Sequence, residues 1–417
     1  MSLSQQLRHE TGSRRLITLT PDESSTKRMT PVSFGIPPGV PPECRDRRVE
    51  IARLEWRIGD PGDPAAIVDD FCRDLGMPVE ELSKPLTHTA TVGELCGVAV
   101  LISAAAGSAM IGGALGRPSP VGRVPDVVLV AYAHTNTAST TVMPDSRPIV
   151  GPWTASWTST EHAAAVSAVR EAIGRGDVYQ ANVVGHQSAP TIGDPNAIAA
   201  AVASLEPTTY SGGLGGDGWL VASASPECLV SLDLGRVTTR PIKGTAPATA
   251  EGAEFLRSSV KERAEHVMIV DLERNDLAHV AVPGSISVPE LFALRRWCGL
   301  WQAESTIEAE VRPGTRLSDL LRAVCPPGSV TGTPKLAALD HIAALEPVGR
   351  GPAMGALGYL TVAGLVLGLT IRTVAVADDR VHLWTGGGIT WRSEPTAEVA
   401  EAAAKAAPIK AILASQG

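Results

Sequence analysis

The sequence predicts a globular fold built from both helices and strands. Hydrophobic residues make up 44% of its 417 positions and charged residues 19%, a composition typical of soluble domains. Helical periodicity over residues 161–173 and a short apolar run over residues 126–133 illustrate the two patterns. A chain of this length accommodates one large domain or two ordinary ones. Composition and periodicity together therefore predict a mixed α/β protein.

Charge and cysteine usage narrow the class of protein. The net charge is −8 and no basic run is present, so a nucleic-acid partner is not expected. The six cysteines are scattered without metal-ligand spacing, which predicts reduced thiols in a cytoplasmic protein. None of them lies in a Gly-x-Cys-x-Gly setting, so the sequence shows no glutaminase nucleophile.

The N-terminal third begins irregularly and then becomes periodic. Residues 1–45 are rich in Ser, Thr, Pro and Arg, lack the apolar core of a signal peptide, and are expected to be a flexible tail. A strand pattern begins near Arg48, and residues 64–75 have the apolar spacing of a helix. Further strand-like runs occur at 126–133 and 139–143.

The run from Cys96 to Leu115 contains no charged residue. Its length of about twenty residues would permit a membrane span. However, it contains four glycines, two serines and many alanines, so its apolarity is modest. We therefore expect a buried pair of strands here rather than a membrane helix, and no membrane association.

A capping box marks the start of the next helix. Residues 158–161 read Thr-Ser-Thr-Glu, in which the first and last side chains can cap each other's backbone. Gly174 and Gly176 are expected to end this helix. In the strand that follows, alternation places Gln180 and Asn182 on the same side.

Two pairs of glutamates have the same spacing. Glu262 and Glu265 lie three residues apart in a segment predicted to be helical from Glu251 to about Ile269, and Glu398 and Glu401 repeat the spacing on the last helix. Like charges at this separation share one helix face and repel mildly. A solvated acidic face is the simplest explanation of either pair alone. The repeated spacing, however, suggests that the two pairs share one role.

Six sequence blocks occur in an order and spacing that resemble those of the chorismate-utilising enzymes. They are Ser225–Glu227, Thr239–Thr245, Lys261–Leu277, Gly328–Lys335, Ile371–Thr373 and Gly386–Ile389. This family includes anthranilate synthase component I, aminodeoxychorismate synthase component I, isochorismate synthase and salicylate synthase. The resemblance covers roughly residues 150–417, and it is closest to the aminodeoxychorismate synthases because Lys243 stands where the other relatives carry alanine.

The resemblance implies the fold and the domain organisation. We expect an α+β chain with two large, mainly antiparallel sheets packed as a sandwich, with helices outside. Residues 46–150 would form the N-terminal portion of the sandwich, and residues 151–417 the chorismate-binding catalytic region.

The resemblance also implies three catalytic residues. Lys243 would attack chorismate and form a covalent intermediate, while Glu227 would protonate the departing 4-hydroxyl group. Gln180 would orient ammonia, because the water-using relatives carry a basic lysine at this position and a glutamine amide cannot act as that base. The implied product is 4-amino-4-deoxychorismate, a precursor of 4-aminobenzoate and folate. Ammonia would come from a separate glutamine amidotransferase subunit.

The substrate and metal sites are implied in the same way. Four carboxylates beside a substrate with two carboxylates require a cation, and Mg²⁺ suits such oxygen ligands; Glu265 and Glu398 would bind it directly and Glu262 and Glu401 through water. The residues implied to bind substrate are Gly244, Thr245, Gln302, Tyr359, Arg372, Gly387, Gly388 and Lys405.

Departures from the family pattern leave alternatives open, and one of them is Leu336-Ala337 after Lys335 in place of the usual Val-Arg. Gln302 replaces a histidine, Ala246 replaces an arginine, and Ala353 replaces an aromatic residue. Anthranilate or 2-amino-2-deoxyisochorismate synthesis is one alternative. A catalytically silent subunit that only binds chorismate is the other.

Overall fold

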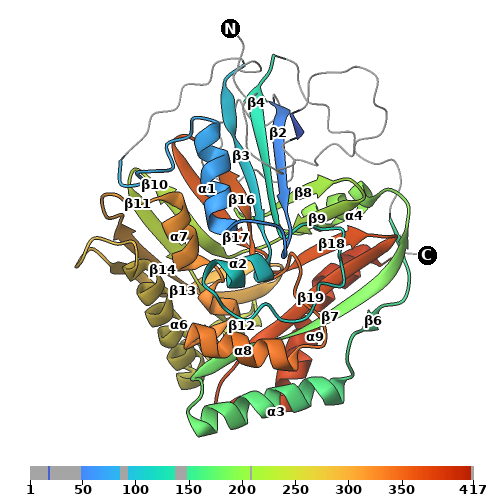
Figure 1. Ribbon diagram of the computed structural model, residues 1–417. Helices are drawn as coiled ribbons and strands as arrows, with labels where there is room; N and C mark the ends of the chain where they lie inside the picture. The colour runs from blue at the N-terminus through green and yellow to red at the C-terminus, as the bar shows by residue number, and fades with distance from the viewer. Residues whose placement is uncertain (1–16, 19–47, 85–92, 137–147, 207–208, 415–417) are drawn as a thin grey trace.

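Two antiparallel sheets, surrounded by helices, make up the molecule (Figure 1). The computed structural model describes residues 17–18, 48–84, 93–136, 148–206 and 209–414. Hydrophobic side chains of both sheets form one large core cluster, to which Val100 and Leu357 contribute from the first sheet and Val221 and Trp384 from the second. The predicted α+β class with two large antiparallel sheets is confirmed.

The larger sheet has eleven strands, and it contains strands from both the N-terminal portion and the C-terminal region of the chain. β3 from the N-terminal portion pairs with β16 from the C-terminal region, with Val100 opposite Gly358. In spatial order the strands are β1 (Ile17–Thr18), β2 (Arg48–Trp56), β4 (Val127–His134), β3 (Leu95–Ile102), β16 (Ala356–Leu360), β17 (Gly364–Leu369), β10 (Cys228–Asp233), β11 (Arg236–Arg240), β14 (Leu300–Glu310) and β12 (Ile242–Pro247), and β13 (Ser287–Trp297) also pairs with β14.

The smaller sheet has eight strands and is built around β7. In spatial order these are β15 (Gly332–Thr333), β7 (Gln180–Ile192), β19 (Arg380–Ile389), β18 (Thr373–Ala377), β9 (Trp219–Ser223) and β8 (Gly212–Gly216), and β5 (Ile149–Val150) and β6 (Thr154–Ala155) also pair with β7. The β7–β19 register sets Asn182 opposite Gly388. This pairing places the glycine run of β19 beside the polar residues of β7.

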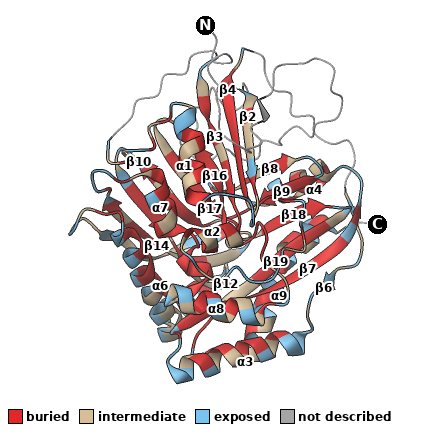
Figure 2. Ribbon diagram, viewed as in Figure 1, coloured by how far each residue is buried: buried red, intermediate tan, exposed pale blue. Residues whose placement is uncertain are grey.

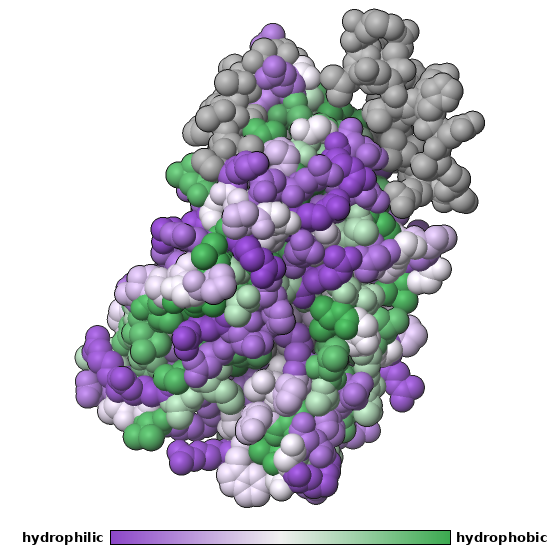
Figure 3. Space-filling model, turned by 60° about the vertical axis from the view of Figure 1, so that its left-hand side comes forward, coloured by the Kyte–Doolittle hydropathy of each residue, from purple (hydrophilic) through white to green (hydrophobic). Residues whose placement is uncertain are grey.

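The helices keep one face in the core and the other in solvent, as the alternating colours of α3 and α6 show (Figure 2). They are α1 (Pro64–Asp74), α2 (Ala104–Met110), α3 (Ser159–Arg175), α4 (Pro195–Ala203), α5 (Ala250–Ser258), α6 (Val260–Ala278), α7 (Leu317–Val324), α8 (Lys335–Leu345) and α9 (Pro395–Leu413), with a 3₁₀ turn, η3, at Gly328–Val330. The side on which α6 and β14 lie mixes hydrophilic and hydrophobic side chains (Figure 3).

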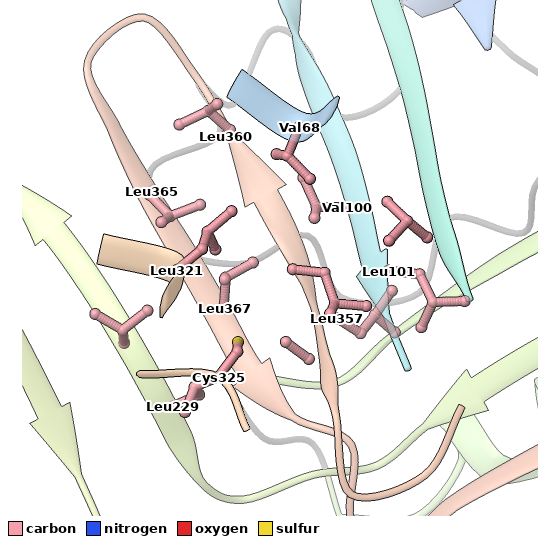
Figure 4. Close-up of a cluster of buried hydrophobic side chains, with 14 of the residues drawn as sticks. Val68, Val100, Leu101, Leu229, Leu321, Cys325, Leu357, Leu360, Leu365 and Leu367 are labelled. Atoms are coloured by element: carbon pink, nitrogen blue, oxygen red, sulfur yellow. The ribbon is translucent and has the colours of Figure 1, made fainter. Parts of the chain in front are cut away.

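Helices α1 and α7 cover part of the larger sheet through aliphatic contacts. Val68 of α1 and Leu321 of α7 lie with Val100, Leu357 and Leu367 in one buried cluster (Figure 4). Burial of a side chain of this size contributes about 1.5–3 kcal/mol. This part of the core therefore holds the N-terminal strands and the C-terminal strands together.

The capping box of α3 is confirmed. The Glu161 carboxylate accepts a hydrogen bond from the Thr158 backbone amide at 2.6 Å, and the Glu161 amide donates to Thr158 Oγ1. Gly176 ends the helix in a left-handed conformation with φ of 85°. Gly174 does not end it; it lies inside the last turn, where a Cβ would come within 3.2 Å of the Trp391 ring.

The prediction of two buried strands over Cys96–Leu115 is correct for the first strand and wrong for the second. The first part is strand β3, but the second part forms the short helix α2. Ser103 caps this helix by accepting a hydrogen bond from the Ala106 amide at 3.0 Å, and the alanines that follow have high helix propensity. No helix among the described residues is long and apolar enough to cross a membrane.

Two other expectations change in detail. The helix predicted from Glu251 to Ile269 is two helices, because Ser259 ends α5 and its side chain caps α6 by accepting from the Glu262 amide at 3.2 Å. Residues 139–143 lie outside the described residues, as does the predicted tail at 1–45 except for β1.

Candidate active site

A pocket lies where the two sheets and two helices meet. The larger sheet contributes β12 and β14, the smaller sheet contributes β7 and β19, and α6 and α9 supply the remaining polar wall. Except for Gln180 and Tyr359, every residue assigned from the sequence to catalysis, substrate or metal lines this pocket. Residues more than 200 positions apart in the sequence, such as Asn182 and Lys405, are therefore neighbours of one cavity.

Lys243 reaches the pocket from an irregular strand. The β12–β14 register shifts between Lys243 and Thr245, and Gly244 has a φ of 79°, which glycine adopts without strain. A Cβ on Gly244 would also meet Leu256 at 3.1 Å and Glu262 at 3.2 Å. Burial, and then the nearby Lys405, lower the pKa of the Lys243 amine. Both effects increase the fraction of the neutral, nucleophilic amine.

Glu227 is a buried carboxyl group that can donate a proton. It is 5% exposed, and burial raises its pKa to about 7, against the opposing hydrogen bond from Ser329 and the charge of Lys243. Ser329 Oγ, on η3, donates to Glu227 Oε1 at 2.7 Å. A carboxyl group with this pKa is partly protonated at neutral pH, which suits a general acid.

Gln180 lies next to Lys243 but does not line the pocket. A Cβ built on Gly388 would lie 2.7 Å from the Gln180 side-chain nitrogen and 2.8 Å from the Lys243 amine. Both groups therefore occupy the space that a side chain at Gly388 would fill. Asn182, on the same side of β7 as Gln180, is the residue that faces the cavity.

The four glutamates of the predicted metal site face one pocket. Glu262 and Glu265 project from α6, and Glu398 and Glu401 from α9. Burial and then the charge of Glu265 raise the pKa of Glu262, and burial raises that of Glu398. A divalent cation would relieve both effects, so the donor set fits Mg²⁺.

The glutamates do not form a closed site by themselves. Across the described ranges, no three His, Cys, Asp or Glu side chains are grouped tightly enough to hold a metal ion. Two lysines lie among the glutamates: Lys405 Nζ is 2.8 Å from Glu401, and Lys261 Nζ is 3.8 Å from Glu265. Lys405 lowers the pKa of Glu401 and also donates to the Gly386 carbonyl at 3.0 Å. A metal here would therefore need further ligands from substrate or water.

Arg372 offers an unpaired donor to the pocket. Its guanidinium carbon lies 3.6 Å from the centre of the Trp297 ring, a cation–π contact. One of its terminal nitrogens is buried without a hydrogen-bond partner, and burial lowers its pKa to about 10, which leaves it charged at neutral pH. A buried, charged and unpaired donor of this kind suits a carboxylate ligand.

Tyr359 does not belong to the site, contrary to the sequence interpretation. It lies on β16, in the middle of the larger sheet, and its hydroxyl donates to Cys96 Sγ at 3.3 Å. Its ring stacks on Tyr132 with centroids 6.4 Å apart. These contacts hold the Tyr359 side chain in the core, and it does not line the pocket.

The departures from the family pattern fall in two environments. Gln302 lines the pocket, 4% exposed and opposite Thr245 in the β12–β14 pair. Ala246 and Ala353 are buried and do not line it. Only the histidine replacement at Gln302 therefore changes the pocket wall itself.

Several lining residues were missed by sequence reasoning. They include Asn182, Lys261, Ser329, Val330, Met354 and Trp384. Strand alternation did place Asn182 beside Gln180, so a signal for this residue existed. Ser329 lies in the family block Gly328–Lys335, but no role could be assigned to it because its contact is with Glu227, in a distant segment.

Comparisons with known proteins agree with this geometry. A family model described as chorismate binding enzyme matches residues 126–411. The chain is 38% identical over 257 residues to anthranilate synthase component 1 of Streptomyces coelicolor, covering 60% of this chain and 50% of that protein. It is 36% identical over 260 residues to aminodeoxychorismate synthase component 1 of Salmonella typhimurium, covering 61% and 57%. The chain thus spans about half the length of the curated relatives it matches.

Solved structures resemble the whole chain. Anthranilate synthase component I from Streptococcus pneumoniae superimposes with a TM-score of 0.73 at 21% identity, covering 95% of both chains. The menaquinone-specific isochorismate synthase of Escherichia coli superimposes with a TM-score of 0.61 at 15% identity, covering 92% of this chain and 96% of that one. At these identities the similarity establishes the fold.

Proposed function

Since this chain belongs to the chorismate binding enzyme family, we propose that it is component I of an aminodeoxychorismate synthase, which converts chorismate and ammonia to 4-amino-4-deoxychorismate. The observation that carries the proposal is Lys243, a pocket amine whose pKa is lowered by burial. It lies beside the Gln180 amide, and the protonatable Glu227 lines the same pocket. This set contains a nucleophile and an acid, and position 180 carries a side-chain amide, which cannot act as a base.

The proposed reaction uses the two titratable groups in turn. The neutral amine of Lys243 attacks C2 of chorismate while Glu227 protonates the 4-hydroxyl group, which leaves as water; an acid in this role contributes roughly 10²–10⁴ in rate. Ammonia then forms a bond to C4, and the bond from C2 to Lys243 breaks with its electron pair returning to the lysine nitrogen. The new ammonium group gives a proton to the Glu227 carboxylate, so both side chains regain their starting states.

Chorismate is a dianion, and the pocket supplies matching groups for its two carboxylates. The unpaired guanidinium nitrogen of Arg372 and the glycine run at Gly387 and Gly388 suit the enolpyruvyl carboxylate. Gly244 and Thr245 suit the ring carboxylate. Lys405 adds a positive charge at the same wall.

The metal expectation becomes part of the proposal. Glu265 and Glu398 would hold Mg²⁺ directly and Glu262 and Glu401 through water, with the ring carboxylate completing the coordination. The bound ion would offset the repulsion between these glutamates and the dianionic substrate. The four glutamates do not close a metal site by themselves, which agrees with a proposed ion that also needs a ligand from the substrate.

Ammonia is proposed to come from a separate glutamine amidotransferase. Relatives of both kinds carry the designation component 1, which implies a second component in those enzymes. The sequence of this chain has no cysteine in a glutaminase setting.

Anthranilate synthesis is the second candidate. Its supporting observation is the 38% identity to the Streptomyces coelicolor anthranilate synthase component, which is slightly above the 36% identity to the Salmonella typhimurium aminodeoxychorismate synthase component. The two reactions differ in the carbon that receives nitrogen and in the release of pyruvate.

One experiment separates the candidates. The purified chain is incubated with chorismate, Mg²⁺ and ammonium, and the products are resolved by chromatography. We expect 4-amino-4-deoxychorismate without pyruvate release. Anthranilate with stoichiometric pyruvate would overturn the assignment in favour of the second candidate, and unchanged chorismate would indicate a silent binding subunit.

A further inference from the structure

Two buried side-chain amides on β7 each have an atom without a hydrogen-bond partner. Asn182 is 5% exposed and Gln180 is 1% exposed, and the unpartnered atoms are Asn182 Oδ1 and Gln180 Nε2. Leaving a buried polar atom unpaired costs about 1–3 kcal/mol. Asn182 lines the pocket, so its oxygen is available to a donor that enters with the reactants.

The backbone around Asn182 is held by several buried hydrogen bonds. The Asn182 amide donates to the Thr331 carbonyl at 2.7 Å, and Arg350 donates to the Asn182 carbonyl at 3.1 Å. Arg350 is itself paired with Glu346 at 2.6 Å, and Glu346 accepts from the Val184 amide at 3.0 Å. The orientation of the Asn182 side chain is thus supported by a rigid strand, as precise positioning requires.

Asn182 lines the same pocket as the proposed nucleophile Lys243, and Gln180 lies next to that amine outside the pocket lining. The Gln180 nitrogen and the Lys243 amine both lie within 3 Å of the position of a Gly388 Cβ, and Gly388 is the strand partner of Asn182. Glycine at this position therefore makes room for both polar groups, and the Asn182 side chain lines the same pocket as the Lys243 amine.

We propose that Asn182 Oδ1 accepts a hydrogen bond from the ammonia that attacks chorismate, and so positions the ammonia lone pair toward C4. The inference rests on the proposed function and adds a positioning residue to it. Ammonia has three N–H donors and one lone pair, so donation to Asn182 leaves the lone pair free. As the bond to C4 forms, the nitrogen becomes positive and its N–H donates more strongly, so the contact stabilises the transition state more than the ground state.

The same contact discriminates against water. A water molecule that attacks carbon must lose a proton to a base, whereas ammonia adds first and loses its proton afterwards. Neither Asn182 nor Gln180 can take a proton near neutral pH, because a side-chain amide oxygen is only an acceptor of hydrogen bonds. The amide pair therefore supports amination of chorismate and gives no help to hydration.

The test is steady-state and single-turnover kinetics of Asn182→Leu in the intact chain. With saturating chorismate and Mg²⁺, we expect kcat/KM for ammonium to fall about 10-fold or more, the effect of losing one hydrogen bond to a nitrogen that becomes charged in the transition state. The KM for chorismate should stay within about twofold of wild type, since the contact is to ammonia. Without ammonium, the mass of the chorismate adduct on Lys243 should appear at the wild-type rate. Added ammonium should then discharge this adduct more slowly.

Two further variants control the result. Asn196 on α4 also has an unpartnered side-chain oxygen but does not line the pocket, so Asn196→Leu should leave kcat/KM for ammonium and the KM for chorismate unchanged. Asn182→Asp keeps an acceptor oxygen and should have a higher kcat/KM for ammonium than Asn182→Leu does. If Asn182→Leu does not fold by circular dichroism, Asn182→Ala provides the same comparison.

A wild-type kcat/KM for ammonium in the folded Leu or Ala variant would overturn the inference. So would a raised KM for chorismate alone, which would mean that Asn182 accepts from a substrate hydroxyl. Failure of the proposed function would be seen in a different measurement: the wild-type chain would form no 4-amino-4-deoxychorismate.

Discussion

At the scale of single residues, the proposed chemistry depends on two side chains whose burial shifts their pKa values toward neutrality. Burial lowers the pKa of the Lys243 amine and raises that of the Glu227 carboxyl group to about 7. Each shift favours the uncharged form. The pocket thus prepares a neutral nucleophile and a protonated acid at the same pH, which neither group would supply in water.

The covalent role of Lys243 can be tested by Lys243→Arg. A guanidinium keeps the positive charge but stays protonated and cannot attack carbon. We expect the yield of 4-amino-4-deoxychorismate to fall by roughly 10²-fold or more, and the chorismate adduct to be absent from the intact mass. Near-normal turnover by this variant would mean that Lys243 is only a positive charge beside a dianion.

The hydrogen bond from Ser329 should set the alkaline limit of activity. In the proposed reaction Glu227 acts in its protonated form, so we expect activity to be lost as pH rises through its pKa. The Ser329 hydroxyl stabilises the carboxylate and holds this pKa down. Ser329→Ala should therefore raise the pKa and move the alkaline limb of the kcat profile to higher pH. Ser318→Ala, a buried serine on α7, is the control, and an unmoved limb in Ser329→Ala would remove Glu227 from the proton-donor role.

At the scale of secondary-structure elements, the site is made by pairing a polar strand with a glycine-rich one. β7 carries Gln180 and Asn182, and β19 runs beside it with Gly386, Gly387 and Gly388. Gly388 and Gly386 are needed for different reasons. A Cβ on Gly388 would meet the Gln180 and Lys243 side chains, whereas a Cβ on Gly386 would lie 2.0 Å from the Val183 carbonyl oxygen.

Gly388→Ala and Gly386→Ala should consequently fail in different ways. The methyl group at Gly388 displaces flexible side-chain ends, so we expect loss of most activity with a Tm close to wild type. The methyl group at Gly386 collides with backbone and should cost about 1–3 kcal/mol of stability, seen as a lower Tm. Equal effects of the two variants on Tm would contradict this distinction.

The helices α6 and α9 contribute the proposed metal ligands in two equally spaced pairs. We expect turnover to stop in EDTA and to return with Mg²⁺, and Glu265→Gln and Glu398→Gln each to abolish it. Because the four glutamates do not close a site alone, Mg²⁺ should raise the Tm appreciably only when chorismate is also present. Full activity after thorough chelation would exclude a role for the cation.

At the scale of the whole molecule, the two sheets share a core that joins sequence-distant parts of the chain. β3 and β16, about 260 residues apart, are hydrogen-bonded neighbours, and the pocket forms where the edge of this sheet meets the smaller one. The site therefore depends on complete assembly of both sheets.

The need for a second protein is a prediction about the whole chain. Ammonium at high pH should support product formation by the chain alone, because the proposed reaction uses neutral ammonia directly. Glutamine should support it only when a separate amidotransferase is added. Glutamate release from glutamine by the purified chain would refute the prediction.

Local patterns in the sequence determined the parts of the structure that depend on neighbours along the chain. The capping box at Thr158–Glu161 specified the start of α3, because the bonds that satisfy a helix end lie within four residues. The ordered blocks around Lys243 and Glu227 identified the family and hence the two sheets. The uncharged run after Cys96 failed as a strand pair because a single capping serine and a run of alanines sufficed to form a helix.

Only the tertiary structure decided which side chains face the pocket. Tyr359 was expected to bind substrate. The order of the strands instead places its side chain in the core, in contact with Cys96. Asn182 and Gln180 alternate to one side of β7, but only the pairing with β19 shows that the Asn182 oxygen and the Gln180 nitrogen are left unpartnered. Ser329 reaches Glu227 across 102 positions of sequence. Such contacts arise from the packing of whole sheets, whose non-local geometry no short stretch of sequence encodes.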